Sequence, residues 1–125
     1  MKRTMCILAC MLMATLAKAD TRYTSTVQAL LEACKSTSGP NMPYCLGFIV
    51  GVSEMMQQVS AGLEGGGDFR AIYGMCPKGH DGPSGGAKVQ VFINWAEKNP
   101  KMWGKDNLIG VITALREAWP CEASN

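Results

Sequence analysis

Metal-ligating and catalytic side chains are scarce in this sequence, and their scarcity excludes several classes of protein. The 125 residues contain a single histidine, His80, which lies in a Lys-Gly-His-Asp-Gly run. A serine or cysteine nucleophile needs a positioned base beside it, and no such set of residues is visible. The acidic residues are scattered singly, without the close pairs that carry acid–base chemistry. We therefore expect no catalytic residues and no enzymatic activity.

Sequence motifs for metals and phosphate-containing cofactors are missing as well. A zinc site needs closely spaced cysteine or histidine pairs such as CxxC, and the sequence has none. The glycine runs at 65–67 and 85–86 do not belong to a P-loop pattern and follow no strand-like segment. The sequence therefore predicts no metal site and no cofactor.

Long apolar runs are confined to the N-terminus. Lys2 and Arg3 precede an apolar segment at 5–16, and the Ala-Lys-Ala at 17–19 has the small-x-small pattern of a cleavage site. The segment is too short to span a bilayer. The alternative is a lipoprotein that is modified at Cys10. The apolar run before Cys10 is too short for this, so we favour a signal peptide at 1–19 that is cleaved. Residues 20–125 then form a single helical domain.

Cleavage changes both the net charge and the number of cysteines. It removes three of the twelve basic residues, so nine remain against ten acidic residues and the net charge becomes −1. No basic surplus is left for nucleic acid or an anionic membrane surface. Four cysteines remain: Cys34, Cys45, Cys76 and Cys121. An even set in a small exported chain indicates two disulfides and an oxidising compartment, most simply a bacterial periplasm.

Four segments show the apolar periodicity of α-helices, and none shows the alternation of a strand. These segments are 24–34, 44–63, 87–98 and 106–119. Ser25 with Gln28 fits a capping box at the start of the first segment, and Asp106 fits the N-cap of the last. The predicted fold is therefore all-α, a small disulfide-stapled bundle of about four helices.

Residues 62–86 separate the second and third predicted helices and hold nine of the fourteen glycines. Repeated glycine and proline argue against a long helix or strand, although 68–73 fits one helical turn or a short extended piece. Loops of this length in small domains are usually functional or disordered. We predict one long glycine-rich loop here.

Two glycines one turn apart, Gly47 and Gly51, lie inside the second predicted helix. Glycine within a helix costs about 1 kcal/mol relative to alanine, so these positions indicate either a weak helix or close packing of another backbone, and we favour close packing. That neighbour is either a helix of the same chain or a second subunit, and the sequence does not choose between them.

The expected arrangement of helices bears on how the cysteines pair. Short connections predict antiparallel neighbours, which places Cys34 and Cys45 at one end of the bundle within reach of Cys121. Cys76 reaches the same end if the glycine-rich loop runs back along the bundle. Three pairings stay open. We favour Cys34–Cys121 with Cys45–Cys76, and the alternative is Cys34–Cys45 with Cys76–Cys121.

Five motifs in order resemble the Rap/Tai family of periplasmic immunity proteins. They are CKS at 34–36, YCLGFIVGV at 44–52, MCPKG at 75–79, FINWAEKNP at 92–100 and ALREAWPC at 114–121. The resemblance implies an all-helical fold that is often dimeric. It also implies that the protein binds and inhibits a peptidoglycan amidase delivered by type VI secretion. No catalytic residue carries over, whereas the four cysteines do.

In such families, inhibition places protein surface over the active-site cleft of the enzyme. The glycine-rich segment departs from the family pattern, so contact residues cannot be transferred to it by motif. We take as candidates for toxin contact five residues in or near loops: Asp68, Arg70, Tyr73, His80 and Trp103. Trp103 fits equally well as a packing residue under the turn before the last helix.

A second function remains open at this stage. A small periplasmic stress protein, or an acid-chaperone-like helical protein without enzymatic activity, has a similar size and a similar use of disulfides. Such a protein dissociates and exposes apolar surface at low pH.

Overall fold

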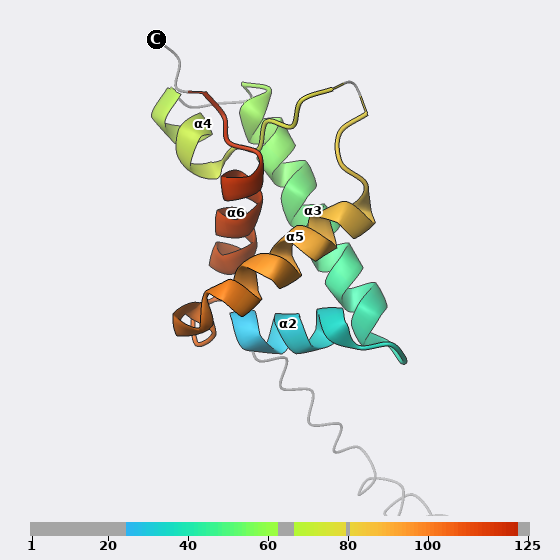
Figure 1. Cartoon of the computed structure of the whole chain (residues 1–125). Coiled ribbons are helices and arrows are strands. Elements are labelled where there is room, and N and C mark those ends of the chain that lie inside the picture. The colour runs from blue at the N-terminus through green and yellow to red at the C-terminus, as the bar shows by residue number, and fades with distance from the viewer. Residues whose placement is uncertain (1–24, 63–66, 80, 123–125) are drawn as a thin grey trace, which may run out of the picture.

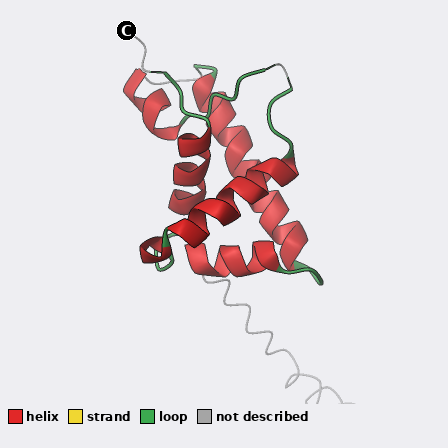
Figure 2. Ribbon diagram, in the orientation of Figure 1, coloured by secondary structure: helices red, strands yellow, loops and turns green. Residues whose placement is uncertain are grey.

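The computed structural model describes residues 25–62, 67–79 and 81–122 (Figure 1). The predicted signal peptide at 1–19 and His80 lie outside the described residues. Five α-helices and one short 3-10 helix form the regular structure of the described part, which contains no named strand (Figure 2). The all-α prediction is confirmed. Within the same ranges, no helix is both long enough and apolar enough to cross a membrane.

The four long predicted segments correspond to four of the helices, with ends shifted by a few residues. In chain order the elements are α2 (Val27–Lys35), α3 (Asn41–Ser60), α4 (Gly67–Tyr73), α5 (Gly85–Lys98), the 3-10 helix η1 (Pro100–Met102) and α6 (Asn107–Ala118). The predicted loop at 62–86 is therefore interrupted, because α4 lies within it and its last two residues begin α5.

The start of α2 differs from the capping box predicted at Ser25. Thr26 is the N-cap, and its Oγ1 accepts a hydrogen bond of 3.2 Å from the backbone N–H of Ala29. The carbonyl of Ser25 instead accepts a hydrogen bond of 2.8 Å from the backbone N–H of Asn107. Asp106 caps α6 as predicted, with its carboxylate accepting from Leu108 N at 2.9 Å. The first residues of α2 and α6 are thus hydrogen-bonded side by side.

The hydrophobic core lies where α2, α5 and α6 meet α3. Each of these four helices contributes a fully buried side chain: Leu30 from α2, Ile49 from α3, Phe92 from α5 and Leu115 from α6. Burying a side chain of this size contributes about 1.5–3 kcal/mol relative to leaving it exposed. In Figure 1, α2 runs crosswise beneath the lower ends of α3, α5 and α6. Helices α2 and α3 are neighbours, as predicted, but they cross instead of running antiparallel.

The disulfides join Cys34 to Cys45 and Cys76 to Cys121, so the pairing that we favoured was wrong and the alternative is observed. Cys45 lies near the start of α3, whereas Ser60, the last residue of α3, lies 3.5 Å from the Sγ of Cys121. A helix rises 1.5 Å per residue, which separates Cys45 from Ser60 by about 22 Å along its axis. The two disulfides therefore hold opposite ends of α3, and the four cysteines do not gather at one pole.

Close packing at a glycine occurs at Gly110 rather than at Gly47 or Gly51. A Cβ atom at Gly110 would lie 2.5 Å from the Cγ2 of Val27, so α2 and α6 touch here. Around the Cβ positions of Gly47 and Gly51, no described atom lies within 4 Å apart from the adjoining residues and the backbone of α3 itself. Both glycines are exposed on α3. The expected close neighbour is therefore not a helix in the described part of this chain.

Candidate functional site

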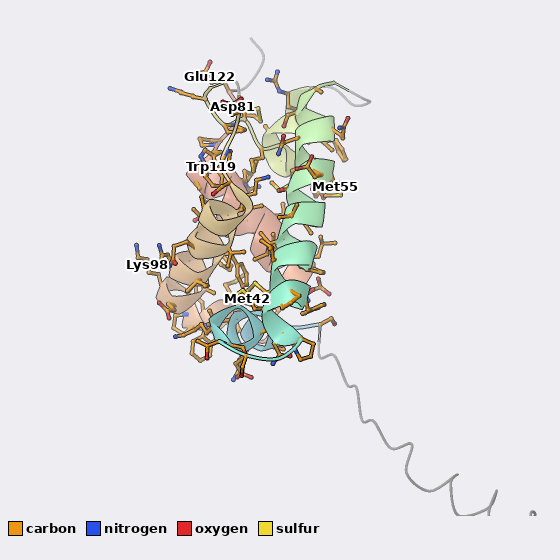
Figure 3. The ribbon with its side chains drawn as sticks, turned by 90° about the vertical axis from the view of Figure 1, so that its right-hand side faces the viewer. Met42, Met55, Asp81, Lys98, Trp119 and Glu122 are labelled. Carbon is orange, nitrogen blue, oxygen red and sulfur yellow. A yellow bond between two sulfur atoms is a disulfide. The ribbon has the colours of Figure 1, made fainter. Side chains whose placement is uncertain are left out.

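Three of the residues predicted to contact a toxin lie on α4, namely Asp68, Arg70 and Tyr73. This helix lies at one end of the molecule, beside the C-terminal ends of α3 and α6 (Figure 1). The described segments that follow α4 and α6 run over the same end. Figure 3 shows Asp81, Trp119 and Glu122 gathered there, with Met55 projecting outward from α3 farther down.

Large apolar side chains are exposed on α4. Phe69, Ile72 and Tyr73 are 44%, 47% and 37% exposed, and we call these three residues the α4 patch. The rings of Phe69 and Tyr73 lie one helical turn apart, with their centroids 4.8 Å from each other. Exposed aromatic residues of this kind are typical anchors of protein interfaces. The α4 patch is therefore a candidate contact surface, and sequence reasoning identified only Tyr73 of its three members.

The C-terminal end of α4 is fixed by hydrogen bonds to its carbonyl groups. The backbone N–H of Gly74 donates to the carbonyl of Arg70 at 2.8 Å, and Nη1 of Arg116 on α6 donates to the carbonyl of Ile72 at 3.2 Å. A Cβ atom at Gly74 would collide with the carbonyl oxygen of Arg70 and lie 2.8 Å from the Oγ of Ser60. The chain can therefore turn this tightly after α4 only with a glycine at that position.

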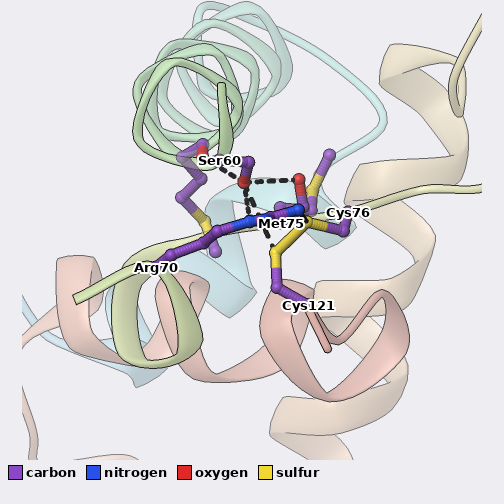
Figure 4. The surroundings of a disulfide bond; sticks show 6 residues. Ser60, Arg70, Met75, Cys76 and Cys121 are labelled. Carbon is purple, nitrogen blue, oxygen red and sulfur yellow. Dashed lines mark hydrogen bonds between the residues drawn. A yellow bond between two sulfur atoms is a disulfide. The ribbon is translucent and has the colours of Figure 1, made fainter. Parts of the chain in front are cut away.

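Ser60 fastens the segment after α4 to the last turn of α3 (Figure 4). Its Oγ accepts a hydrogen bond of 2.8 Å from the backbone N–H of Met75. The same hydroxyl lies 2.8 Å from the carbonyl oxygens of both Met56 and Met75, and its single hydrogen can be donated to either. The side chain of Met75 is fully buried beneath this contact. The backbone that leaves α4 is thus held at one buried point.

The Cys76–Cys121 disulfide ties the same segment to the end of α6. The backbone N–H of Cys76 also donates to the carbonyl of Trp119 at 3.0 Å. Nη2 of Arg70 lies 3.6 Å from the Sγ of Cys76, and the Oγ of Ser60 lies 3.5 Å from the Sγ of Cys121. Both sulfur atoms therefore have a polar donor group as a neighbour.

An open pocket of about 500 Å³ lies beside α4, between α3, α5 and the described residues at 75–79 and 81–83. Two cationic side chains, Arg70 and Lys88, and two carboxylates, Glu54 and Asp81, line it. We call it the Arg70 pocket. The Lys88 side chain is only 6% exposed, and its Nζ lies 3.6 Å from the carboxylate of Glu54, which is 59% exposed. No sequence pattern indicated that Lys88 would be buried.

The remaining predicted contact residues do not join α4. Trp103 follows η1 in the connection between α5 and α6, and this orange segment lies at the opposite end of the molecule from α4 (Figure 1). Its Nε1 donates to the carbonyl of Ala96 at 2.8 Å, and its ring packs against the core. Trp103 therefore packs under the turn between α5 and α6, which was one of its two predicted roles. His80 lies outside the described residues, and within them no cluster of metal-ligating side chains occurs.

Comparison with known protein families identifies the chain. The family model for Rap1a immunity proteins matches residues 26–121, which span all five helices. The chain therefore belongs to the Rap1a immunity protein family, in agreement with the resemblance seen in the sequence. Proteins of this family are not enzymes, and they neutralise amidase effectors of type VI secretion by binding them. No curated protein and no solved structure gave a match.

The family and the two disulfides together indicate that the protein acts outside the cytoplasm. Disulfides persist in oxidising compartments and are rare in the cytosol, where thiols are kept reduced.

Proposed function

We propose that this Rap1a protein neutralises its amidase by docking the α4 end of the molecule over the active-site cleft of the enzyme. The observation that supports the proposal most is the α4 patch, in which three large apolar side chains are exposed on a seven-residue helix. Protein interfaces have an apolar centre with a polar rim. Asp68 directly precedes Phe69, and Arg70 lies between Phe69 and Ile72 in the sequence of α4. These two residues supply charges for such a rim.

The contacts that hold α4 favour this use of the patch. Association costs free energy when flexible side chains and loops become ordered, so a surface that is already ordered binds more tightly. The end of α4 is held by Arg116, by Ser60 through Met75, and by the Cys76–Cys121 disulfide. These contacts reduce the entropy lost on docking.

We also propose that residues 1–19 direct export and are removed, and that residues 20–125 act in the periplasm as a single domain. The two disulfides support an oxidising compartment. A periplasmic location would also place the inhibitor where a peptidoglycan amidase meets its substrate. Mass measurement of the protein purified from the producing cell tests the cleavage site, and a mature chain that begins at Asp20 is expected.

A matched pair of substitutions tests the docking surface. Ile72 in the α4 patch is 47% exposed and Ile109 on α6 is 49% exposed, so Ile72→Ala and Ile109→Ala remove the same exposed atoms at two distant places. We expect Ile72→Ala to weaken amidase binding about 10-fold or more, because an anchor residue contributes more than about 1 kcal/mol. Ile109→Ala should bind within twofold of wild type.

Calorimetry with the amidase gives the affinity, and peptidoglycan hydrolysis by the amidase gives the inhibition. The docking proposal fails if Ile72→Ala and Tyr73→Ala both bind and inhibit like the wild-type protein. The stress-protein alternative predicts a different result, namely a wild-type protein that binds no amidase and dissociates at low pH.

We further propose that the protein forms a homodimer through the exposed face of α3. Gly47, Gly51 and Met55 recur at intervals of four residues and therefore share this face, on which Met55 is a large apolar side chain that is 43% exposed. The open space above both glycines allows a second backbone to approach closely. Sedimentation of wild type and Gly51→Leu tests this interface. A dimer that the substitution disrupts is expected, and a wild-type monomer overturns the proposal.

A further inference from the structure

We propose that the Arg70 pocket is a binding site for a single carboxylate group, supplied by an aspartate or glutamate side chain of the bound amidase. This inference rests on the proposed function, because the pocket adjoins the α4 patch and Arg70 belongs to the same helix. Docking of the patch would therefore carry neighbouring side chains of the enzyme to the pocket.

The main argument is the incomplete set of partners around Arg70. A guanidinium has five N–H donors, and in the described part of the chain the only hydrogen-bonding contact of the Arg70 guanidinium is 3.6 Å long, from Nη2 to the Sγ of Cys76. Its Nε is buried and has no hydrogen-bond partner. No carboxylate of the described residues lies within ion-pair distance of it. Buried polar groups in proteins are nearly always hydrogen-bonded, so an unsatisfied Nε indicates an absent partner.

Carboxylates are the natural partner for such a group. They accept two parallel hydrogen bonds from a guanidinium, and these charge-assisted pairs are stronger than neutral hydrogen bonds. Because the Nε is enclosed, a carboxylate that binds its edge must first turn the Arg70 guanidinium toward the pocket.

Lys88 provides a second, independent reason. Its side chain is only 6% exposed, and its only ion-pair partner among the described residues is Glu54 at 3.6 Å. That distance is too long for a good N–H···O hydrogen bond. Burying a charge is costly unless it is paired and hydrogen-bonded. An incoming carboxylate would give Lys88 a close partner on the same pocket wall.

The carboxylates of the pocket restrict the ligand to one negative charge. Glu54 and Asp81 are both exposed, so they stay hydrated and face the pocket as negative groups. A dianion such as phosphate would be repelled by them at short range. Among the described lining residues, the balance of two cations and two anions therefore favours one carboxylate over a more highly charged ligand.

Substitutions of Arg70 test the role of the pocket in amidase binding. We expect Arg70→Gln to weaken binding at least 10-fold and Arg70→Lys to recover part of the loss, because lysine keeps the charge without the two-pronged geometry. Lys98→Gln is the matched control, since Lys98 is exposed on α5 and its loss changes the net charge equally. It should bind within twofold of wild type. Equal affinities for Arg70→Gln and wild type overturn the proposed source of the carboxylate.

A second experiment uses wild-type protein alone and does not depend on a folded variant. The Arg70 Nε–H signal in a nitrogen–proton NMR spectrum is followed while N-acetylglutamic acid α-amide is added. The neutral isostere N-acetylglutamine amide serves as the control. A shift with the acid and none with the amide is expected, and the absence of a shift overturns the carboxylate site.

The two experiments separate the pocket from the proposed function. If wild-type protein binds no amidase, the proposed function fails while the NMR titration still decides whether the pocket binds a carboxylate. If the Arg70 Nε–H signal shifts but Arg70→Gln binds the amidase like the wild-type protein, the pocket binds a free carboxylate. That result contradicts the proposal that the carboxylate comes from a side chain of the amidase.

Discussion

The guanidinium of Arg70 contacts a disulfide, with Nη2 lying 3.6 Å from the Sγ of Cys76. The partner sulfur, on Cys121, has the hydroxyl of Ser60 at 3.5 Å. Both cysteines are partly exposed, whereas Cys34 and Cys45 are buried in the core. The two disulfides of the protein therefore differ in access and in their polar surroundings.

This difference predicts that a dithiol reductant opens Cys76–Cys121 before Cys34–Cys45. A disulfide breaks when a thiolate attacks one sulfur and the other leaves as a thiolate, and a nearby cation stabilises that leaving group. Graded dithiothreitol followed by alkylation and peptide mass mapping gives the order of opening. Arg70→Gln should slow the first step several-fold. Simultaneous reduction of both disulfides contradicts the prediction.

Gly110 is expected to be intolerant of alanine. A Cβ there meets Val27 at 2.5 Å in the core, and overpacking of this kind typically costs about 1–3 kcal/mol. Gly86→Ala, in the first turn of α5, is the matched helical control, because a Cβ there meets no neighbouring atom. It should raise stability by about 0.5–1 kcal/mol through helix propensity. Urea unfolding measures the stability of both variants. A Gly110→Ala variant as stable as the control would show that α2 and α6 do not touch here.

Ser60→Ala should destabilise the protein more than Ser53→Ala, although both serines lie on α3. Loss of the Ser60 hydroxyl leaves the backbone N–H of Met75 without its partner, and an unsatisfied buried donor costs about 1–3 kcal/mol. Ser53 donates only to the carbonyl of Val50 in its own helix, so its removal leaves no donor unpaired. Thermal unfolding of the two variants gives the comparison. A Ser60→Ala variant as stable as Ser53→Ala would rule out Ser60 as the anchor of the segment after α4.

The two candidate caps of α2 can be separated in the same way. Thr26→Ala removes the side-chain hydrogen bond to Ala29 N and should cost about 0.5–2 kcal/mol. Ser25→Ala keeps the Ser25 carbonyl that accepts from Asn107, so it should change stability by less than about 0.5 kcal/mol. Chemical unfolding measures both values, and the reverse order would favour the capping box read from the sequence.

Much of the helical structure could be predicted because its signal is local. The apolar stripe of α3 includes Ile49, Val52 and Met56, which recur at helical spacing and are all buried. Asp106 was identified as an N-cap because a carboxylate beside the first free N–H groups is a short-range contact. The capping box at Ser25 was misplaced by one residue, because the Ser25 carbonyl pairs with Asn107, which is far away in the sequence.

The candidate site was less accessible to sequence reasoning. Tyr73 and Arg70 were selected for their chemistry, but the exposure of Phe69 and Ile72 depends on how α4 lies against α3 and α6. Lys88 on α5 is buried where it lines the Arg70 pocket with residues of α3 and of the segment that follows α4. Burial and pocket geometry depend on packing between distant segments, and no pattern of neighbouring residues encodes them.

The sequence by itself determined the helical segments, the need for two disulfides and the membership of the immunity family, because these follow from periodicity, cysteine count and motif order. The tertiary structure alone decided which cysteines pair. The crosswise packing of α2 puts Cys34 next to Cys45, and the length of α3 keeps that pair far from Cys121. Disulfide pairing depends on distances between side chains in the folded chain, and those distances are set by how the helices pack.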